Sequence, residues 1–111
     1  MRTVTLISPA GEFDDGYDFY PNNLDCGWII DPPGDDPIHL EITYLNTEDG
    51  GDYVRVYDGG DYTAALLGEF YGDNYSKPDY IITSTNGVMF VRFTTNESGS
   101  DYGFTAQYWV S

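Results

Sequence analysis

A short acidic stretch in the middle of the chain has the residue types that bind metal ions. It contains Glu48, Asp49 and Asp52, which surround the glycine pair at 50–51. It leads directly into an alternating segment, residues 53–57, that ends at Asp58-Gly59. Calcium prefers hard oxygen ligands and takes about six to eight of them. The stretch therefore predicts a calcium site beside a strand, or else an acidic turn that is only solvated. Its ligand spacing is not that of an EF-hand.

Other reactive side chains are few. His39 is the only histidine, and its place on the polar side of an alternating segment predicts a surface position. No Gly-x-Ser-x-Gly or Gly-x-Gly-x-x-Gly motif is present, and a glycosidase-like carboxylate pair has no positive support, so we do not expect an enzyme. Cys26 is the only cysteine, which excludes an intrachain disulfide. We expect a buried, inert thiol, with an intermolecular bridge as the alternative.

The charge balance restricts the partners. The chain has 19 Asp and Glu against four Lys and Arg, for a formal net charge of −15. Such a field repels nucleic acids and anionic membrane surfaces, and it favours cations and basic proteins. A halophilic protein has the same composition without any specific partner, and this alternative stays open.

The sequence shows neither the pattern of a signal peptide nor that of a membrane-spanning segment. No apolar run approaches the ~20 residues that span a membrane. Met1-Arg2 leads straight into the β-branched residues 3–7 without the apolar stretch of a signal peptide. We therefore expect either a mature fragment with an added Met or a chain that is not exported by that route, and no membrane insertion.

Short strands account for nearly all of the regular pattern. Alternating or β-branched runs, each ended by Gly, Pro, Asn or Asp, predict strands at residues 3–7, 26–30, 38–44, 53–57, 64–70, 80–85, 88–94 and 104–110. The strands at 80–85 and 88–94 are joined at Asn86-Gly87, and residues 12–22 are predicted to be a loop with aromatic anchors. Seven or eight such strands predict a single all-β domain over residues 1–111, a sandwich or jelly roll.

Five blocks of the sequence resemble a CUB domain, and they fall in the order of that family over nearly the whole chain. The blocks are residues 20–30 (Tyr-Pro-Asn-Asn-Leu-Asp-Cys-Gly-Trp-Ile-Ile), 38–40 (Ile-His-Leu), 52–59 (Asp-Tyr-Val-Arg-Val-Tyr-Asp-Gly), 67–72 (Leu-Gly-Glu-Phe-Tyr-Gly) and 93–108, which ends in Gly-Phe-Thr-Ala-Gln-Tyr. The resemblance implies a two-sheet antiparallel jelly-roll sandwich. It also implies a non-catalytic extracellular module that binds proteins or, in some members, glycans.

The cysteines depart from the family pattern. CUB domains usually have four cysteines in two bridges, whereas this chain retains Cys26 alone. The position of the second pair falls near Asp49 or Gly50 and at Tyr71. The loop after Ser8-Pro9 is also longer than in the family. A divergent member, lacking the family's disulfides, fits this pattern.

The resemblance also implies a ligand set for one calcium ion, whose acidic rim receives a lysine of the partner. Carried over by position, the metal ligands are Glu48, Asp52 and Asn96. Asn96 stands where the family has a third carboxylate, so we expect a weaker affinity, although an amide oxygen also binds calcium. Tyr20 steadies a ligand, and Ser98 and Gly99 stand where the family supplies neutral oxygens. Glu97 or Asp101 would compensate for the missing charge.

Two triplets are N-glycosylation acceptors, those that begin at Asn74 and Asn96. Such triplets also occur unmodified by chance, and a sugar on Asn96 would compete with metal ligation. Loop aromatics predict either a cover for the sheet ends or a platform for sugar stacking or protein docking. They are Phe13, Tyr17, Phe19, Tyr71 and Tyr75.

The leading hypothesis is a calcium-modulated adhesion or recognition module that binds the Lys or Arg of a basic protein. A second hypothesis is a structural subunit that self-assembles through sheet edges or end loops into a filament or coat. A third is a glycan-binding module. The resemblance implies an extracellular or cell-surface location for each of them.

Overall fold

The computed structural model describes residues 2–15, 22–47, 51–72, 80–96 and 103–110. All regular elements within these ranges are strands. They are β1 (Arg2–Leu6), β2 (Ala10–Asp14), β3 (Asp25–Ile30), β4 (Ile38–Asn46), β5 (Tyr53–Tyr57), β6 (Leu66–Phe70), β7 (Tyr80–Thr83), β8 (Met89–Thr94) and β9 (Gly103–Val110). Among the described residues, no helix is long and apolar enough to cross a membrane.

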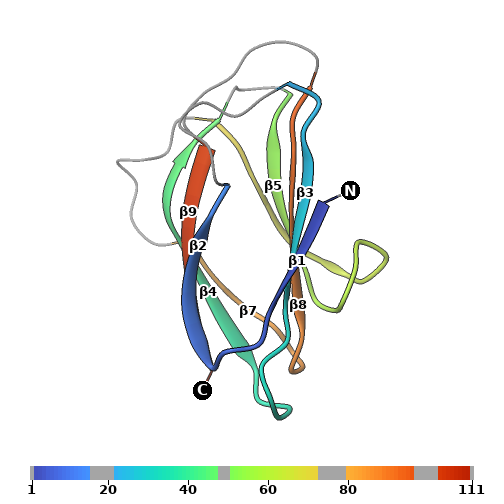
Figure 1. Cartoon of the computed structure of the whole chain (residues 1–111), viewed down its shortest axis with the longest axis vertical. Coiled ribbons are helices and arrows are strands. Elements are labelled where there is room, and N and C mark those ends of the chain that lie inside the picture. Colours follow the sequence, from blue (N-terminus) through green and yellow to red (C-terminus); the bar gives the residue numbers. More distant parts are fainter. Residues whose placement is uncertain (1, 16–21, 48–50, 73–79, 97–102, 111) are drawn as a thin grey trace.

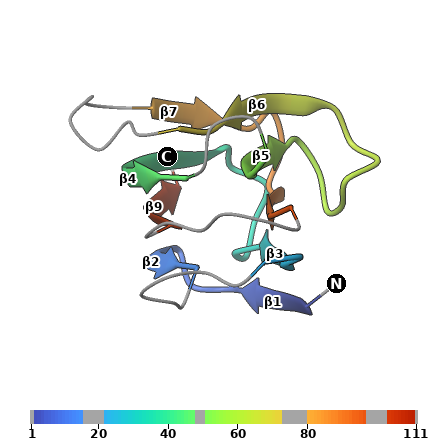
Figure 2. The ribbon, with the colours of Figure 1, turned by 90° about the horizontal axis from the view of Figure 1, so that it is seen from above.

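The strands form two sheets that face each other (Figure 1). The first has the order β1-β3-β8-β5-β6, and the second has the order β2-β9-β4-β7. The described strands pair antiparallel, except that β1 runs parallel to β3. Seen from above, β1 and β2 lie at one edge of the sandwich, and β6 and β7 lie at the other (Figure 2). This arrangement confirms the predicted all-β, two-sheet fold.

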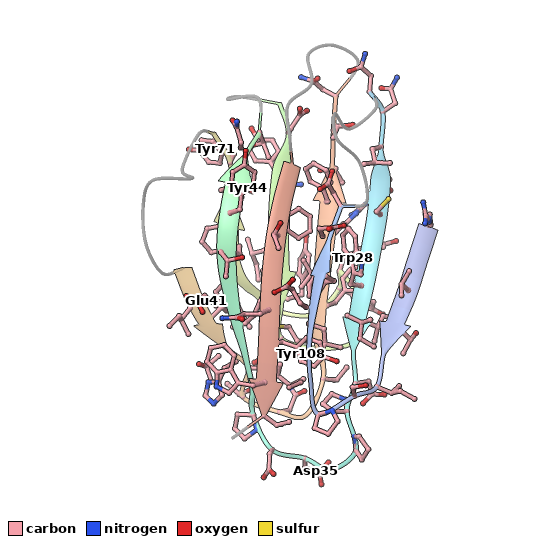
Figure 3. All side chains as sticks on the ribbon, turned by 60° about the vertical axis from the view of Figure 1, so that its left-hand side comes forward. Trp28, Asp35, Glu41, Tyr44, Tyr71 and Tyr108 are labelled. Carbon is pink, nitrogen blue, oxygen red and sulfur yellow. The ribbon has the colours of Figure 1, made fainter. Side chains whose placement is uncertain are left out.

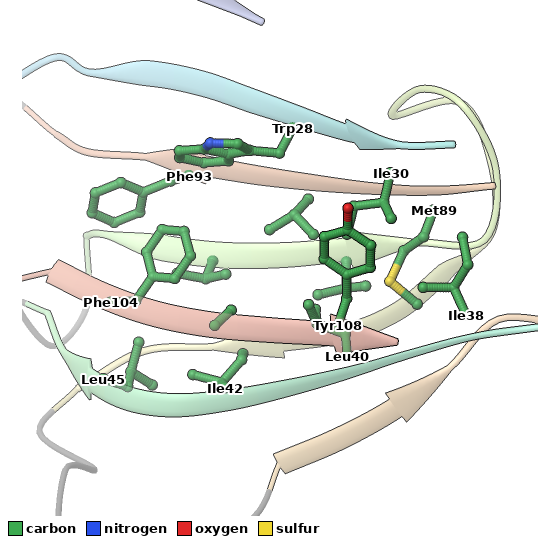
Figure 4. Packing of buried hydrophobic residues seen from close by; sticks show 14 of the residues in the cluster. Trp28, Ile30, Ile38, Leu40, Ile42, Leu45, Met89, Phe93, Phe104 and Tyr108 are labelled. Atoms are coloured by element: carbon green, nitrogen blue, oxygen red, sulfur yellow. The ribbon is translucent and has the colours of Figure 1, made fainter. Parts of the chain in front are cut away.

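The core fills the space between the sheets. Alternation directs Leu40 and Ile42 of β4 inward, where each is at most 3% exposed, while His39 and Glu41 point outward. Aromatic rings occupy one end of the core, where Trp28 and Phe93 each lie within 5.4 Å of Phe104, ring centre to ring centre (Figure 4). Both contacts are edge-to-face, the arrangement that the charge distribution of aromatic rings favours.

Strand β2 was not predicted from the sequence. The sequence predicts a loop at residues 12–22 and a first strand that ends at residue 7. Instead, Ala10–Asp14 pairs with β9 and directs Phe13 inward, where its ring lies 5.4 Å from that of Trp28. Gly11 and the acidic residues around it are typical of turns, but pairing with β9 outweighs this local preference. Phe13 is therefore a residue that packs on the core and does not belong to a surface platform.

The Asn86-Gly87 connection differs from a hairpin. Both flanking strands form, but β7 lies in the four-stranded sheet and β8 in the five-stranded sheet, so they do not pair with each other. A Cβ at Gly87 would lie 2.7 Å from the carbonyl oxygen of Gly34 and 2.9 Å from Cα of Asp35. The connection is thus packed tightly against the loop that follows β3, at the end of the molecule where Figure 3 labels Asp35.

Candidate metal centre

Two of the three predicted metal ligands, Asp52 and Asn96, belong to the described residues. The third ligand, Glu48, lies outside them. So do its neighbour Asp49, the predicted supporting residues Tyr20, Glu97, Ser98, Gly99 and Asp101, and the glycosylation candidate Asn74. The geometry below concerns Asp52, Asn96 and the residues that hold them.

Asp52 directly precedes β5 and is fully buried, with 0% exposure. The buried Thr47 holds this position, because its hydroxyl donates to the Asp52 carbonyl at 3.4 Å. Thr47 also bonds twice with Gly72: its N–H donates to the Gly72 carbonyl at 2.9 Å, and its hydroxyl accepts from the Gly72 N–H at 2.8 Å. One threonine thus joins the end of β4, the start of β5 and the residue that follows Tyr71.

Asn96 reaches the same place from the end of β8. Its N–H donates to Oδ1 of Asp52 at 2.8 Å, and its carbonyl accepts from the N–H of Asn23 at 2.7 Å. The preceding residue is fastened as well: the Thr95 N–H donates to the Leu24 carbonyl at 2.9 Å, and the Leu24 N–H donates to the Thr95 hydroxyl at 2.6 Å. These bonds extend the β3–β8 pairing and fix Asn96 against Asp52.

The glycine at position 51 permits this approach. A Cβ there would lie 2.7 Å from Cγ of Asn96 and would overlap its side-chain nitrogen. The Asn96 amide therefore lies directly against the backbone of Gly51. Sequence reasoning missed the roles of Gly51, Thr47, Asn23 and Thr95. No local pattern marks them, because each acts through a residue that is distant in the sequence.

The described part of the site offers a carboxylate and a side-chain amide, both of them oxygen ligands that suit a hard cation. Among the described residues, no three His, Cys, Asp or Glu side chains gather in a way that would hold a metal ion. The described residues thus provide at most part of a coordination sphere, and Glu48 and residues 97–102 lie outside them.

The family model for the CUB domain matches residues 6–108 of this chain. The chain belongs to the CUB family. It is 34% identical to exoskeleton protein RP43 of Riftia pachyptila, over 97% of this chain and 26% of that protein. It is 33% identical to human tolloid-like protein 2, over 97% of this chain and 10% of that protein. Human cubilin is 31% identical, over 96% of this chain and 3% of cubilin. The CUB domain thus spans about a quarter or less of the length of these relatives.

Solved structures have the same fold. The full extracellular region of zebrafish Gpr126/Adgrg6 matches with a TM-score of 0.81 and 25% identity, over 98% of this chain and 15% of that one. A crystal structure of the MASP-1 CUB2 domain bound to Ca²⁺ matches with a TM-score of 0.79, over 96% of this chain and 97% of that one. Its identity of 20% makes it evidence for the fold alone.

A second buried acid of this CUB domain, Asp15, has a structural role that the sequence did not predict. It is 6% exposed, its N–H donates to the Phe104 carbonyl at 3.3 Å, and its Oδ1 accepts from the Phe104 N–H at 3.4 Å. Gly103 adopts a φ of +91° beside this carboxylate, in the region that favours glycine. Asp15 thus fastens the start of β9 to the end of β2.

The other two reactive residues, His39 and Cys26, pack against neighbouring side chains of the fold. His39 lies half-buried on the outer face of the four-stranded sheet, where Nδ1 is 2.9 Å from the Thr83 hydroxyl and the ring stacks on Trp109 at 5.6 Å. Cys26 is 4% exposed, and burial raises the pKa of its thiol. A high pKa leaves little reactive thiolate, which supports the expected inert thiol.

One member of the predicted aromatic platform lies on the described surface. Tyr71 is 45% exposed and contacts the ring of Tyr53 edge-on at 5.4 Å (Figure 3). Tyr17, Phe19 and Tyr75 lie outside the described residues. The platform for sugar stacking or protein docking thus stays a prediction, and Phe13 is not part of it.

Proposed function

We propose that this CUB domain is a non-catalytic extracellular recognition module that binds one calcium ion and presents the acidic rim of that site to the Lys or Arg of a protein partner. The observation that carries the proposal is the 2.8 Å hydrogen bond from the Asn96 N–H to the buried Asp52 carboxylate. It brings two proposed ligands together although they are 44 positions apart in the sequence.

Calcium fits the chemistry of the donor set. Glu48, Asp52 and Asn96 would hold the ion, with Tyr20, Ser98, Gly99 and Asp101 beside it. All of these side chains and backbones offer oxygen, which calcium prefers. The match to the MASP-1 CUB2 domain bound to Ca²⁺ supports the proposal by analogy. Because Asn96 is neutral, we expect a lower affinity than a third carboxylate would give.

A basic protein partner fits the charge of the domain. A net charge of −15 attracts cationic surfaces and accelerates their association. The similar proteins support an extracellular setting. RP43 is an exoskeleton protein, and the matching structure of Gpr126/Adgrg6 is that of its extracellular region. A non-catalytic role fits the described surroundings of His39, which pairs with a threonine hydroxyl and an indole ring.

Thermal unfolding with and without calcium tests the metal site. A ligand that binds only the native state raises its stability by mass action, so the melting temperature should rise in millimolar calcium relative to chelator. Asp52→Ala should abolish this rise, and Asn96→Asp should enlarge it by restoring a charge. Asp35→Ala, an exposed acid at the far end of the molecule, is the matched control and should keep it (Figure 3). An unchanged midpoint in the wild-type domain would disprove the calcium site.

Titration of a lysine-rich peptide tests the partner chemistry. We expect heat of binding in calcium that weakens in chelator and at high salt. An aspartate-rich peptide of equal length is the control for nonspecific adsorption. Equal binding of the lysine-rich peptide to wild type and to Asp52→Ala would show that the rim of the calcium site is not the binding surface.

A further inference from the structure

Strand β1 is an edge strand with little of the usual protection against pairing, since its only charge is that of Arg2 at its first residue. Sheet edges are normally blunted by charges, bulges, prolines or short length. Each of the other described edge strands has at least one of these features. Strand β2 contains the acidic residues Glu12 and Asp14. Strand β6 contains Glu69 and pairs with β5 at a register irregularity, and β7 is only four residues long. In contrast, β1 pairs with β3 in unbroken register and contains neither an acidic residue nor a proline. Strand β1 lies at the outer edge of the molecule (Figure 2). Its first four residues, Arg2 to Thr5, are exposed.

The direction of the β1 backbone groups follows from one hydrogen bond. The Leu6 carbonyl accepts from the Asp31 N–H at 2.8 Å, on the side that faces β3. Because successive residues of a strand alternate in direction, Val4 bonds toward β3 as Leu6 does, while Thr3 and Thr5 turn their N–H and carbonyl groups away from it. The edge thus presents two residues with the donor and acceptor that an added strand needs.

The side chains of this edge are apolar or neutral beyond Arg2. Val4 is 41% exposed, and Ile7, directly after the strand, is 68% exposed. These are two of the six large hydrophobic side chains that are exposed among the described residues. In a chain of net charge −15, this edge therefore combines backbone groups that face away from β3 with apolar surface, and the strand carries no negative charge.

We propose that two copies of this chain associate through antiparallel pairing of their β1 strands about a twofold axis at Val4. The segment Thr3-Val4-Thr5 reads the same in both directions, so Thr3 would face Thr5 of the partner subunit, and Val4 would face Val4 of the partner subunit. A twofold contact requires such self-complementarity, because each residue meets its counterpart in reverse order.

The backbone directions agree with this register. Thr3 and Thr5 of the partner subunit form a hydrogen-bonded pair, since both turn their polar groups outward. The two Val4 residues form a non-hydrogen-bonded pair, in which the side chains approach most closely. Arg2 lies opposite Leu6 of the partner subunit, so no like charges face each other along the strands. The two five-stranded sheets become one continuous sheet.

The net charge of the chain makes this dimer depend on salt concentration. Two domains of net charge −15 repel each other, and salt screens this repulsion. Dimerisation should therefore strengthen with salt, whereas binding of a basic partner should weaken. The inference does not rest on the calcium site, and the dimer should form equally in chelator. It also closes on itself, so it would not by itself extend into the filament of the self-assembly hypothesis.

Sedimentation velocity from micromolar to millimolar protein, at high salt in chelator, tests the proposal. We expect a monomer–dimer equilibrium in the wild type. Val4→Lys should abolish the dimer by placing two charges at the axis, and Thr5→Pro should abolish it by removing an outward N–H while leaving those that face β3. Ile81→Lys is the matched control, because Ile81 is an exposed apolar residue (53%) on the opposite edge strand β7 and should not affect the dimer. Circular dichroism verifies the fold of each variant.

Amide hydrogen exchange locates the contact independently of any variant. The N–H groups of Thr3 and Thr5 should exchange more slowly as the protein concentration rises, while that of Leu6 should be protected at every concentration. A wild-type monomer throughout the range would overturn the proposal. So would a dimer that resists Val4→Lys, or protection of Thr3 and Thr5 that appears only when a different protein is added.

Discussion

The backbone N–H of Asn96 donates to Oδ1 of Asp52 at 2.8 Å, inside a site where Asp52 has 0% exposure. A buried donor or acceptor that loses its partner is costly, so this bond stabilises the position of Asn96 after β8 whether or not a metal ion is present. Asp52 therefore has a structural role in addition to its proposed role as a ligand. The two roles respond differently to mutation.

Asp52→Ala should lower the free energy of unfolding by about 1–3 kcal/mol in chelator, because the Asn96 N–H loses its buried acceptor. Asp52→Asn should cost less, since its amide oxygen can accept the same bond. Urea denaturation in chelator measures both values. The exposed Asp35→Ala control should change stability by no more than about 0.5 kcal/mol. Equal losses for the Ala and Asn variants would contradict the structural role of the Asp52 oxygen.

Gly51→Ala should destabilise the domain and weaken any response to calcium, because the new methyl group overlaps the Asn96 side chain. Overpacking of this kind costs about 1–3 kcal/mol. Gly60→Ala is the matched control, since a Cβ there meets its nearest neighbour, Val88, only at 4.0 Å. Urea denaturation and calcium-dependent melting compare the two variants. If both alanine variants behave alike, the close approach of Asn96 to Gly51 is wrong.

Alternation within single strands made most of the fold predictable. The run from Ile38 to Ile42 shows the buried and exposed sides of β4 without any knowledge of its neighbours. At the register irregularity between Ile42 and Tyr44 the alternation shifts, so that Leu45 is buried and Tyr44 is not, and the strand continues to Asn46. Strand β2 was missed because Gly11 and Asp14 favour a turn, and only pairing with β9 makes them a strand. The sheet that each strand joins, as at Asn86-Gly87, also depends on packing and is not a local property.

The site was predictable only in part, for a similar reason. The acidic spacing indicated Asp52, and the family resemblance indicated Asn96. The residues that hold them together, Thr47 and Thr95, bond to partners that are 25 and 71 positions away. No spacing within one stretch shows such bonds, since folding creates them.

Gly103→Ala should destabilise the domain more than Gly34→Ala. Both glycines have a positive φ, +91° and +96°, where an alanine is strained by about 1–2 kcal/mol. A Cβ at Gly103 would also overlap the carboxylate of the buried Asp15, whereas a Cβ at Gly34 meets nothing within 4 Å. Urea denaturation of the two variants isolates this overlap, because the backbone strain is common to both. Equal destabilisation would show that Asp15 does not pack against Gly103.

Acid should weaken the domain partly through Asp25. Its side chain accepts two 3.0 Å hydrogen bonds from Arg92, whose guanidinium holds the pKa of the carboxyl below its ordinary value of 3.8. A group whose pKa is lower in the folded state stabilises the fold above the unfolded pKa and loses this contribution as the pH falls through the folded value. The Asp25 carboxyl is 38% exposed, so solvent screens the pair and the effect should be modest.

Asp25→Asn should therefore reduce the loss of stability below about pH 4, although it lowers stability at neutral pH by removing the ion pair. Urea denaturation at a series of pH values from 7 to 3 measures the slope. Asp36→Asn removes the same charge from an exposed loop position and serves as the control. Because net charge changes equally in both variants, general charge repulsion cancels in the comparison. An acid slope that is the same in both would show that the Asp25–Arg92 pair does not contribute to acid sensitivity.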